Sequence, residues 1–518
     1  MKKSDLLALA FIEGGMVMLL ETSSPLIVVP ILGHSVMIWA TMICLSVGAL
    51  ALGYFLGAFL SRKERDDFFP VRMFAIISFI LLTGWSLFYL QNFTGLDLGT
   101  ASFTWIIVFI VLFVPLVIFG ATTPVIISIL NQKFSIDKSV VGRLYSTSTI
   151  GGVLFSLITG YWLIPDMGVS DTILLAIILT SILPFLVYIR EKKRIFSLGM
   201  SIVIVGAIIL TQTQPELTDN DDFKIEYFSE SINGQLIVAD FEDQGQMNRI
   251  LFINRMGQTW ITKKNRNSIW PYVNTTTCLS YMYPPQSRSL VLGLGGGILP
   301  GQLQGFSRHM VDAVEIDQRI IDISREYFGL NGVHVICDDA RRYVKKCEQS
   351  YDFIVLDIFS GEILPSHVLS KEAFEDIRRI LRPNGLIAIN FNGFLEGNEG
   401  LAGRSLMKTL EAAGFQFSIV DANMGKSPVA DRNLLYLAYL KKPDWSRAGS
   451  VTFGEEEYFI KDELVEPYTI DYRDGIVITD DSPVMEHLNR FAADKWRDSY
   501  LKNFTRTFKK EHELPFVQ

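Results

Sequence analysis

The sequence predicts a multi-pass α-helical membrane domain followed by an α/β, Rossmann-like domain with a small N-terminal β-element. In the first two-fifths of the 518-residue chain, charges occur only in short clusters between long apolar runs, whereas in the rest they are spread evenly. Beyond the first quarter of this second part, short apolar segments alternate with helical stretches. The predicted domains are a transmembrane domain at 1–211, a linker at 212–222, a small β-domain at 223–283 and a Rossmann-like domain at 284–518.

Long apolar stretches in the N-terminal half predict about seven membrane-spanning helices. A helix needs about 20 apolar residues to cross a bilayer, and these stretches are apolar all round rather than amphipathic like core helices. Gly53 and Gly57 have the spacing that lets two such helices approach closely. The predicted stretches are about 6–32, 36–60, 71–90, 103–130, 144–164, 171–189 and 195–211.

Two acidic residues, Glu13 and Glu21, lie inside the first apolar stretch. A carboxylate at membrane depth is costly, so it usually faces a partner or a wet cavity. Two interpretations are open. Either these acids have a function, or they lie near the ends of the helix or carry a proton.

Bulk composition excludes several classes of protein. Four cysteines are widely spaced, which predicts free thiols rather than a disulfide framework or a zinc site. The net charge of −8 gives no sign of nucleic-acid binding. We therefore expect no metal and no nucleic-acid partner.

Five short apolar segments in the C-terminal half are predicted strands of one parallel, doubly wound sheet. Such sheets bind ligands where the strands end at their carboxyl edge. Two earlier segments with alternating polarity, 235–239 and 249–253, predict a small antiparallel element. The five predicted strands are 289–293, 311–317, 333–336, 351–357 and 386–390.

A glycine-rich turn follows the first of these strands and predicts a nucleoside site. The turn, residues 293–297, would let a ligand lie against bare backbone. Glu315 ends the second strand, where an acid suits the two hydroxyls of a ribose, and Asp339-Ala340 follows the third. A dinucleotide fits less well than an adenosyl-sulfonium ligand, because Ile298 stands where the third glycine of a dinucleotide fingerprint would be.

Asp357 ends the fourth strand and would face the cleft where a reactive carbon lies. The alternative is that its carboxylate only caps the helix that follows. We favour a role in the site, because ligands bind where the strand order of such a sheet reverses.

Residues from about 225 to 390 resemble the spermidine synthase family, the polyamine aminopropyltransferases. The resemblance implies a small β-domain before a methyltransferase-like Rossmann domain, decarboxylated S-adenosylmethionine as co-substrate, and transfer of its aminopropyl group to an amine. It implies cofactor binding by Gln258, Gly295, Gly296, Gly297, Glu315, Asp339 and Ala340. It implies catalytic roles for Tyr272, between cofactor and acceptor, and for Asp357, the first acid of an Asp-x-x-Asp loop.

Two positions depart from that family's pattern. Ile298 stands where an aspartate usually follows the three glycines, and Ser360 replaces the second acid of the Asp-x-x-Asp loop. These acids help to hold cationic amines, and a protonated amine must lose a proton before it can attack. Glu362 and His367 are the candidate substitutes from the same loop, and we assign Glu362 to the catalytic group.

The whole chain also resembles a bacterial subgroup of multi-pass proteins with a C-terminal domain of this family. The residues that carry this resemblance are Glu21 followed by Pro30-Ile31-Leu32-Gly33, the run at 120–124, and Thr479-Asp480-Asp481-Ser482-Pro483.

Three hypotheses follow for function. The first is a membrane-bound aminopropyltransferase of polyamine biosynthesis. The second is a transferase that uses an S-adenosyl donor, such as S-adenosylmethionine, on a lipid or another acceptor. The third is a non-catalytic sensor or transporter that binds a nucleoside or polyamine. The expected partners are a small amine or lipid acceptor and a lipid bilayer, and a homodimer is left open.

Two kinds of signal disagree on which side of the membrane the C-terminal domain lies. Lys and Arg are lacking in three alternate loops, 33–35, 91–102 and 165–170, which places the N-terminus in the cytoplasm. Seven helices would then put the C-terminal domain outside. An S-adenosyl donor and free cysteines favour the cytoplasm, and we expect a multi-pass protein of the cell membrane with a cytoplasmic soluble domain.

Overall fold

A computed structural model shows two compact units, one built on the N-terminal helices and the other on the C-terminal sheets. The structure describes residues 2–33, 36–62, 66–93, 105–134, 138–212, 223–243, 245–359, 361–362, 364–422, 432–453, 456–459 and 470–497. Residues 213–222 of the predicted linker lie outside the described residues.

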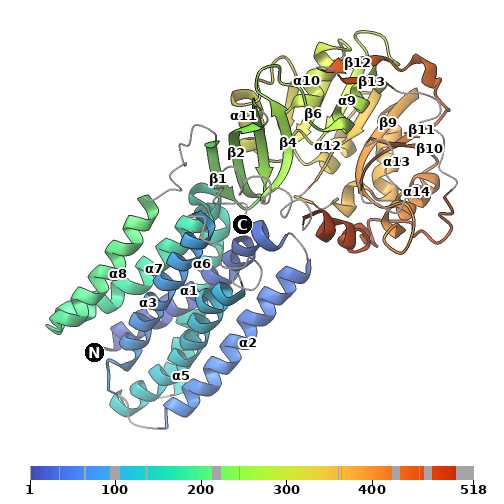
Figure 1. Cartoon of the computed structure of the whole chain (residues 1–518). Coiled ribbons are helices and arrows are strands. Elements are labelled where there is room, and N and C mark those ends of the chain that lie inside the picture. The colour runs from blue at the N-terminus through green and yellow to red at the C-terminus, as the bar shows by residue number, and fades with distance from the viewer. Residues whose placement is uncertain are drawn as a thin grey trace. The chain divides into compact units, whose positions relative to one another are not determined.

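Long helices make up the first unit (Figure 1). Among the described residues, six helical segments are long and apolar enough to cross a membrane, by length and composition. The predicted stretches 144–164 and 171–189 are two parts of one 50-residue segment, Val141–Arg190. The helices are α1 (Lys3–Leu32), α2 (Val36–Leu60), α3 (Phe69–Phe93), α5 (Val114–Phe134), α6 (Lys138–Ile158), α7 (Ile164–Arg190) and α8 (Arg194–Gln212), with the π-helical turns η1 (Phe109–Phe113) and η2 (Thr159–Leu163).

Gly168 interrupts the helical backbone within the 50-residue segment. Its φ of 83° and ψ of 174° are not helical, so the segment consists of two helical arms on either side of this residue. A straight helix of this length would measure about 75 Å, far more than the ~30 Å hydrocarbon core of a bilayer. The break therefore lies between the predicted stretches 144–164 and 171–189.

Glycines let pairs of helices in this unit pack backbone to backbone. A Cβ added at Gly53 or Gly57 of α2 would lie 2.3 Å from the Val117 carbonyl oxygen or 2.6 Å from that of Ala121, both in α5. The close approach predicted from the spacing of these two glycines is confirmed. A Cβ at Gly14 of α1 would likewise lie 1.9 Å from the carbonyl oxygen of a serine in α6.

The carboxylate of Glu13 lies inside this helical unit. It is 3% exposed, and Ser148 of α6 donates a hydrogen bond to its Oε2 atom at 2.9 Å. Among the described residues it makes no ion pair. It therefore has a polar partner, as expected of an acid at membrane depth.

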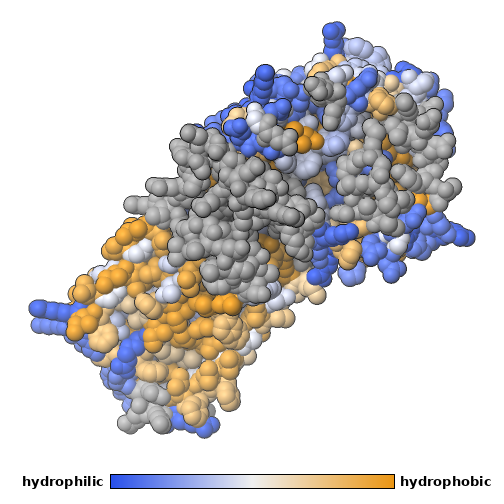
Figure 2. Space-filling view, viewed as in Figure 1, coloured by the Kyte–Doolittle hydropathy of each residue, from blue (hydrophilic) through white to orange (hydrophobic). Residues whose placement is uncertain are grey.

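Large apolar side chains cover much of the outer surface of this unit, as Figure 2 shows over the helices. Phe55 is 72% exposed, Phe79 62% and Ile195 84%. Apolar surface of this extent is unusual on a protein surrounded by water, and it suits contact with lipid.

The small β-element is a four-stranded sheet in the order β1-β2-β3-β4. Its last two strands form an antiparallel hairpin, which agrees with the predicted antiparallel element. Asn254 and Arg255 make its tight turn with φ values of 50° and 65°. The strands are β1 (Phe223–Ser231), β2 (Gly234–Asp243), β3 (Gln246–Ile253) and β4 (Met256–Thr262), and helix α9 (Pro271–Ser280) follows.

The large sheet has seven strands in the order β10-β11-β9-β8-β5-β6-β7. The five predicted strands pair in parallel, and β11 runs antiparallel to both of its neighbours. The predicted Rossmann-like, methyltransferase-type fold is confirmed. The strands are β5 (Arg288–Leu292), β6 (Met310–Glu315), β7 (His334–Cys337), β8 (Tyr351–Leu356), β9 (Leu381–Gly393), β10 (Gln416–Asp421) and β11 (Arg432–Tyr439), beside a separate hairpin of β12 (Ser450–Phe453) and β13 (Glu456–Phe459).

Helices connect the strands of the large sheet, and its core is built from apolar strand and helix side chains. Helix α13 is strongly amphipathic and buries Phe374 and Ile377 against this core. The helices are α10 (Ile298–Gly305), α11 (Gln318–Glu326), α12 (Ala340–Lys346), α13 (Lys371–Ile380), α14 (Leu401–Ala412) and α15 (Met485–Leu488), with the 3₁₀ turns η3 (Ser366–Val368) and η4 (Trp445–Arg447).

The strand order of the large sheet reverses between β5 and β8. The chain runs from β5 outward through β6 to β7 on one side, then returns to β8 on the other. In sheets of this kind the connecting segments diverge at such a point and leave room for a ligand. The glycine turn after β5 and the loop after β8 lie at this reversal.

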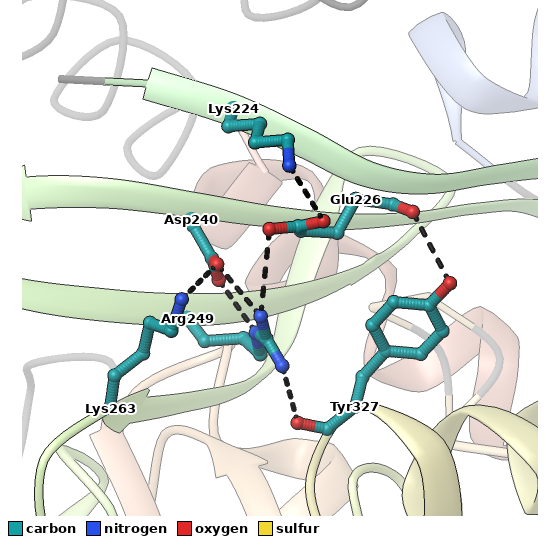
Figure 3. A network of polar contacts seen from close by, with 6 residues as sticks. All are labelled: Lys224, Glu226, Asp240, Arg249, Lys263 and Tyr327. Atoms are coloured by element: carbon teal, nitrogen blue, oxygen red, sulfur yellow. Dashed lines mark hydrogen bonds and ion pairs between the residues drawn. The ribbon is translucent and has the colours of Figure 1, made fainter. Parts of the chain in front are cut away.

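A polar network fixes the small sheet to helix α11 of the Rossmann-like domain (Figure 3). Arg249 of β3 binds Asp240 of β2 through two hydrogen bonds of 2.6 and 2.7 Å and also donates to the carbonyl oxygen of Tyr327 at 2.6 Å. Lys263 binds the same carboxylate at 2.5 Å. Although burial opposes it, these hydrogen bonds hold the pKa of Asp240 below its usual value. The network positions strand β4 beside the glycine turn.

Candidate active site

The glycine turn brings the ends of strands β5, β6 and β8 together. The backbone N–H of Gly293 donates to the Val314 carbonyl at 2.9 Å, and that of Asp357 donates to the Leu292 carbonyl at 2.8 Å. Gly293, with φ of 94°, passes so close to the Asp357 backbone that an added Cβ would lie 2.0 Å from its carbonyl oxygen. The predicted turn and the predicted acid are therefore direct neighbours.

Replacing Gly293 by Ala is expected to destabilise the C-terminal domain and displace Asp357. The left-handed backbone alone costs about 1–3 kcal/mol for a residue with a side chain, and the contact with the Asp357 carbonyl adds to it. Thermal unfolding of the two proteins measures the effect. Gly305→Ala is the matched control, because that glycine ends helix α10 with open space around it, and alanine there is expected to be neutral or slightly stabilising. Equal melting temperatures for the two variants would contradict this account.

Glu315 lies at the end of β6 and faces the glycine turn. Its carboxylate is 8% exposed and accepts hydrogen bonds from the backbone N–H groups of Leu294 at 3.1 Å and Asp317 at 3.0 Å. Burial raises the pKa of Glu315, while these N–H groups oppose the rise. An ionised carboxylate has about four acceptor positions, so two vicinal hydroxyls can still bind.

Asp357 is held by two side chains from different elements. Tyr272 of α9 donates its hydroxyl hydrogen to Oδ2 at 3.0 Å, and Asn390 of β9 donates to Oδ1 at 2.8 Å. Burial raises the pKa of Asp357, and the two hydrogen bonds oppose the rise. Burial and the adjacent carboxylate raise the pKa of Tyr272 well above its ordinary value. The tyrosine therefore stays a donor, and the two hydrogen bonds fix the orientation of the Asp357 carboxylate.

Strand β4 contributes two side chains on the other side of the turn. Gln258 donates to the carbonyl oxygen of Gly361 in the loop after β8 at 2.9 Å. Thr259 accepts a hydrogen bond from the N–H of Gly296 at 2.8 Å. The structure thus brings the predicted Gln258 to the loop that follows Asp357.

Asp339 and Ala340 lie where β7 leads into helix α12. The Asp339 carboxylate caps this helix by accepting from the N–H of Arg342 at 2.8 Å. His367 approaches the same carboxylate at 3.6 Å. Asp339 therefore caps helix α12, in addition to its predicted contact with the adenine of the donor. The candidate substitute His367 lies next to Asp339.

Glu362 is buried and forms an ion pair with Arg497 near the end of the described chain. Its side chain is only 4% exposed. Its negative charge is thus already balanced by a guanidinium. A cationic amine would have to share this carboxylate with Arg497 if Glu362 replaced the missing family acid. Ile298 is the first residue of helix α10, and Ser360 lies outside the described residues.

Three residues that contact this part of the structure were not predicted from the sequence: Asn390, Thr259 and Arg497. Asn390 is the polar residue that ends the fifth predicted strand, and pairing of Leu356 with Ile389 places it beside Asp357. That signal was present in the sequence. Thr259 directly follows Gln258, but its bond to the turn depends on how the small sheet packs. Arg497 gave no signal, because it lies 135 residues from its partner.

No group of His, Cys, Asp and Glu that could hold a metal ion occurs among the residues that the structure describes. The four cysteines are free thiols in the structure. The fold defines the C-terminal domain as a Rossmann-like, methyltransferase-type domain, with a glycine turn and the buried acids Glu315 and Asp357 at the carboxyl edge of its sheet.

Comparison with known proteins shows which proteins this domain resembles. Residues 280–410 match the spermine/spermidine synthase domain. A polyamine aminopropyltransferase of Vibrio vulnificus is 30% identical over 202 residues, which cover 38% of this chain and 61% of that protein. Polyamine aminopropyltransferase 2 of Aquifex aeolicus is 21% identical over 403 residues, covering 74% of this chain and 78% of that protein. The C-terminal part of the chain is thus similar to the spermine/spermidine synthase domain and to polyamine aminopropyltransferases.

A methyltransferase is also among the similar proteins. The N-terminal histidine N-methyltransferase of Emericella nidulans is 36% identical over 115 residues, which cover 21% of this chain and 20% of that protein. The match to the Vibrio protein spans less than two thirds of that protein's length. These similarities therefore leave the activity and the acceptor to be argued from the site.

Proposed function

We propose that this protein is a membrane-bound aminopropyltransferase that moves the aminopropyl group of decarboxylated S-adenosylmethionine to an amine. The observation that carries the proposal is the placement of Asp357, held by Tyr272 and Asn390, directly against the glycine turn at the reversal of the strand order. This is the edge of the sheet at which ligands bind.

The donor is expected to bind along the glycine turn. Glu315 would accept hydrogen bonds from the two ribose hydroxyls, and Asp339 with Ala340 would border the adenine. Gln258 lies across the turn, next to the loop that follows Asp357. The donor's reactive carbon would then lie near the end of β8.

Transfer requires an unprotonated amine. Its nitrogen lone pair attacks the methylene carbon next to the sulfonium, an N–C bond forms, and the C–S bond breaks with its electron pair going to sulfur. The products are an aminopropylated amine and methylthioadenosine. Asp357 would take the proton that the amine loses, with Tyr272 and Asn390 holding its two oxygens in place.

A second candidate function is transfer from an S-adenosyl donor to a lipid or another acceptor that is not a polyamine. The similarity to a histidine N-methyltransferase and the replacement of a family acid by Ile298 favour it. A sensor or transporter that only binds a nucleoside or polyamine is the third.

A panel of donors and acceptors, read by mass spectrometry on the full-length protein in lipid, separates these functions. The proposal predicts an aminopropylated amine with decarboxylated S-adenosylmethionine and no methylated product with S-adenosylmethionine. A methylated or otherwise alkylated product would favour the second function. Binding of methylthioadenosine without any product would favour the third.

We also propose that the helical unit lies in the cell membrane and that the C-terminal domain faces the cytoplasm. The apolar outer surface of the helices and the six segments of membrane-spanning length support the first part. The need for an intracellular S-adenosyl donor supports the second. The lack of Lys and Arg in alternate loops opposes it, because with seven helices it would place the C-terminal domain outside the cell.

Labelling of intact cells by a membrane-impermeant thiol reagent tests the orientation. Cys44 and Cys337 are exposed, so the experiment replaces both by Ser and introduces one cysteine at Asp322, on the exposed face of α11. We expect this cysteine to react only after the cells are permeabilised. Labelling in intact cells would show that the domain lies outside.

A further inference from the structure

The loop after strand β8 carries the buried acid Glu362, and the end of the described chain supplies its partner. Residues 490–497 are helical. Arg497 at the end of this helix donates from Nη2 to Oε2 of Glu362 and from Nη1 to the carbonyl oxygen of Asn254 at 3.4 Å. The two side chains of the ion pair are 6% and 4% exposed. A guanidinium is thus enclosed together with the only acid of this loop after Asp357.

Further contacts hold the same loop to the C-terminal segment. The ring of Trp496 lies edge-on to that of Phe359, with 6.2 Å between the centroids. Glu486 accepts hydrogen bonds from the backbone N–H of Ser366 at 3.0 Å and from its hydroxyl at 2.8 Å. Arg497 is therefore held in place from both flanks of the loop rather than reaching in from solvent.

The loop also faces the donor side of the site. Gln258 donates to the carbonyl oxygen of Gly361, the residue before Glu362, and a Cβ added at Gly361 would lie 3.7 Å from Nη2 of Arg497. Glu362 is thus one residue from a backbone group bound by the proposed donor-contacting glutamine, and five residues from Asp357. This loop begins at Asp357, so an amine that reacts beside Asp357 lies at the start of the loop that carries Glu362.

A diamine such as putrescine carries two positive charges near neutral pH. One nitrogen becomes neutral in order to attack, but the other stays an ammonium, and burying it without an anionic partner is costly. In this chain the acid of the loop is already bound to a guanidinium. A second cation would have to displace Arg497 or remain beside it, where like charges repel.

We propose that Arg497 acts as an internal cation that occupies the acidic subsite of the acceptor pocket, so that the site selects acceptors with one amine and an uncharged remainder over diamines. This inference rests on the proposed function, since it assigns the substrate class of the same site. Arg497 is a specificity-determining residue in it, and Asp357 remains the base.

Amine binding to the protein saturated with methylthioadenosine tests the inference without depending on turnover. Calorimetry with putrescine and with propylamine gives the ratio of the two dissociation constants for wild type and variants of the full-length protein. We expect Arg497→Gln to improve putrescine binding relative to propylamine by about tenfold, because a buried carboxylate is released for the second ammonium. The double variant Arg497→Gln with Glu362→Gln should lose this gain. Arg497→Lys should keep the wild-type preference.

Arg490→Gln is the matched control, because this arginine lies on the same helix, is 44% exposed and pairs with Asp494. We expect its ratio to equal that of wild type. If Arg497→Gln does not fold, Glu362→Gln provides the test, since it leaves the guanidinium uncompensated and should weaken putrescine relative to propylamine. An unchanged ratio in the variant that folds, or no binding of either amine, would overturn the inference.

The same proteins distinguish this inference from the proposed function. A shifted binding ratio without any aminopropylated product would uphold the acceptor subsite and reject the transferase. Aminopropyl transfer with an unchanged ratio would uphold the transferase and reject the role of Arg497.

Discussion

Replacing Asp357 by Asn is expected to lower kcat/KM for aminopropyl transfer by about 10²–10⁴-fold, the usual contribution of a positioned general base. The asparagine has nearly the same shape and keeps the position between Tyr272 and Asn390, but it cannot accept the proton that the amine loses. Steady-state kinetics with decarboxylated S-adenosylmethionine and a monoamine measure the loss. Methylthioadenosine binding should change little.

If Asp357 is the base, the pH dependence of kcat/KM should fall on the acidic side as Asp357 becomes protonated. Because burial raises the pKa of Asp357, its ionised, active form should appear only as the pH rises above the ordinary range of an aspartate. The stability effect has the matching sign: the folded protein disfavours the ionised carboxylate, so this residue lowers stability as the pH rises through its folded pKa. Asp357→Asn should therefore not lower the melting temperature much at neutral pH.

Asp322→Asn is the control for this substitution. Asp322 is exposed on α11 and accepts a hydrogen bond only from Gln318 among the contacts described for it. We expect full activity in this variant. A fully active Asp357→Asn protein would remove Asp357 from the role of base.

Replacing Glu315 by Ala is expected to weaken methylthioadenosine binding by about 1.5–3 kcal/mol, roughly 10- to 150-fold. The ribose hydroxyls lose a charged acceptor, and the N–H groups of Leu294 and Asp317 lose theirs. Glu315→Gln should cost less, because the amide oxygen still accepts. Calorimetry with methylthioadenosine measures both.

Glu326→Ala serves as the comparison for Glu315, because it is an exposed glutamate at the end of α11. Its affinity for methylthioadenosine should equal that of wild type. Should Glu315→Ala bind as tightly as this control, the nucleoside site does not lie at the glycine turn.

Much of the C-terminal fold could be predicted because its signals are local in the sequence. Each parallel strand is a short apolar run, and its last residues reach the ligand-binding edge because parallel strands all end there. Glu315 and Asp357 could be placed at this edge without knowing which strands are neighbours. Asn390 could have been added, since strands β8 and β9 pair in parallel and the residue after Ile389 lies beside Asp357.

Contacts between distant parts of the chain could not be predicted from these local signals. Arg497 reaches Glu362 only because the C-terminal segment folds back over the loop after β8. Thr259 binds the glycine turn because Arg249 and its partners fix the small sheet to α11. The break at Gly168 lies inside the predicted loop 165–170 and was therefore expected. The helical conformation of the residues on both sides of it, which joins the two predicted stretches into one segment, was not.

The central claim is tested most directly by following the aminopropyl group itself. Full-length protein in lipid is given decarboxylated S-adenosylmethionine with an isotopic label in the aminopropyl carbons, together with propylamine, and the products are identified by mass spectrometry. We predict a labelled, aminopropylated amine in a one-to-one ratio with methylthioadenosine from wild type, and a strongly reduced yield of both from Asp357→Asn. Release of methylthioadenosine without labelled amine, or equal yields from the two proteins, would contradict the assignment of this site as an aminopropyltransferase with Asp357 as its base.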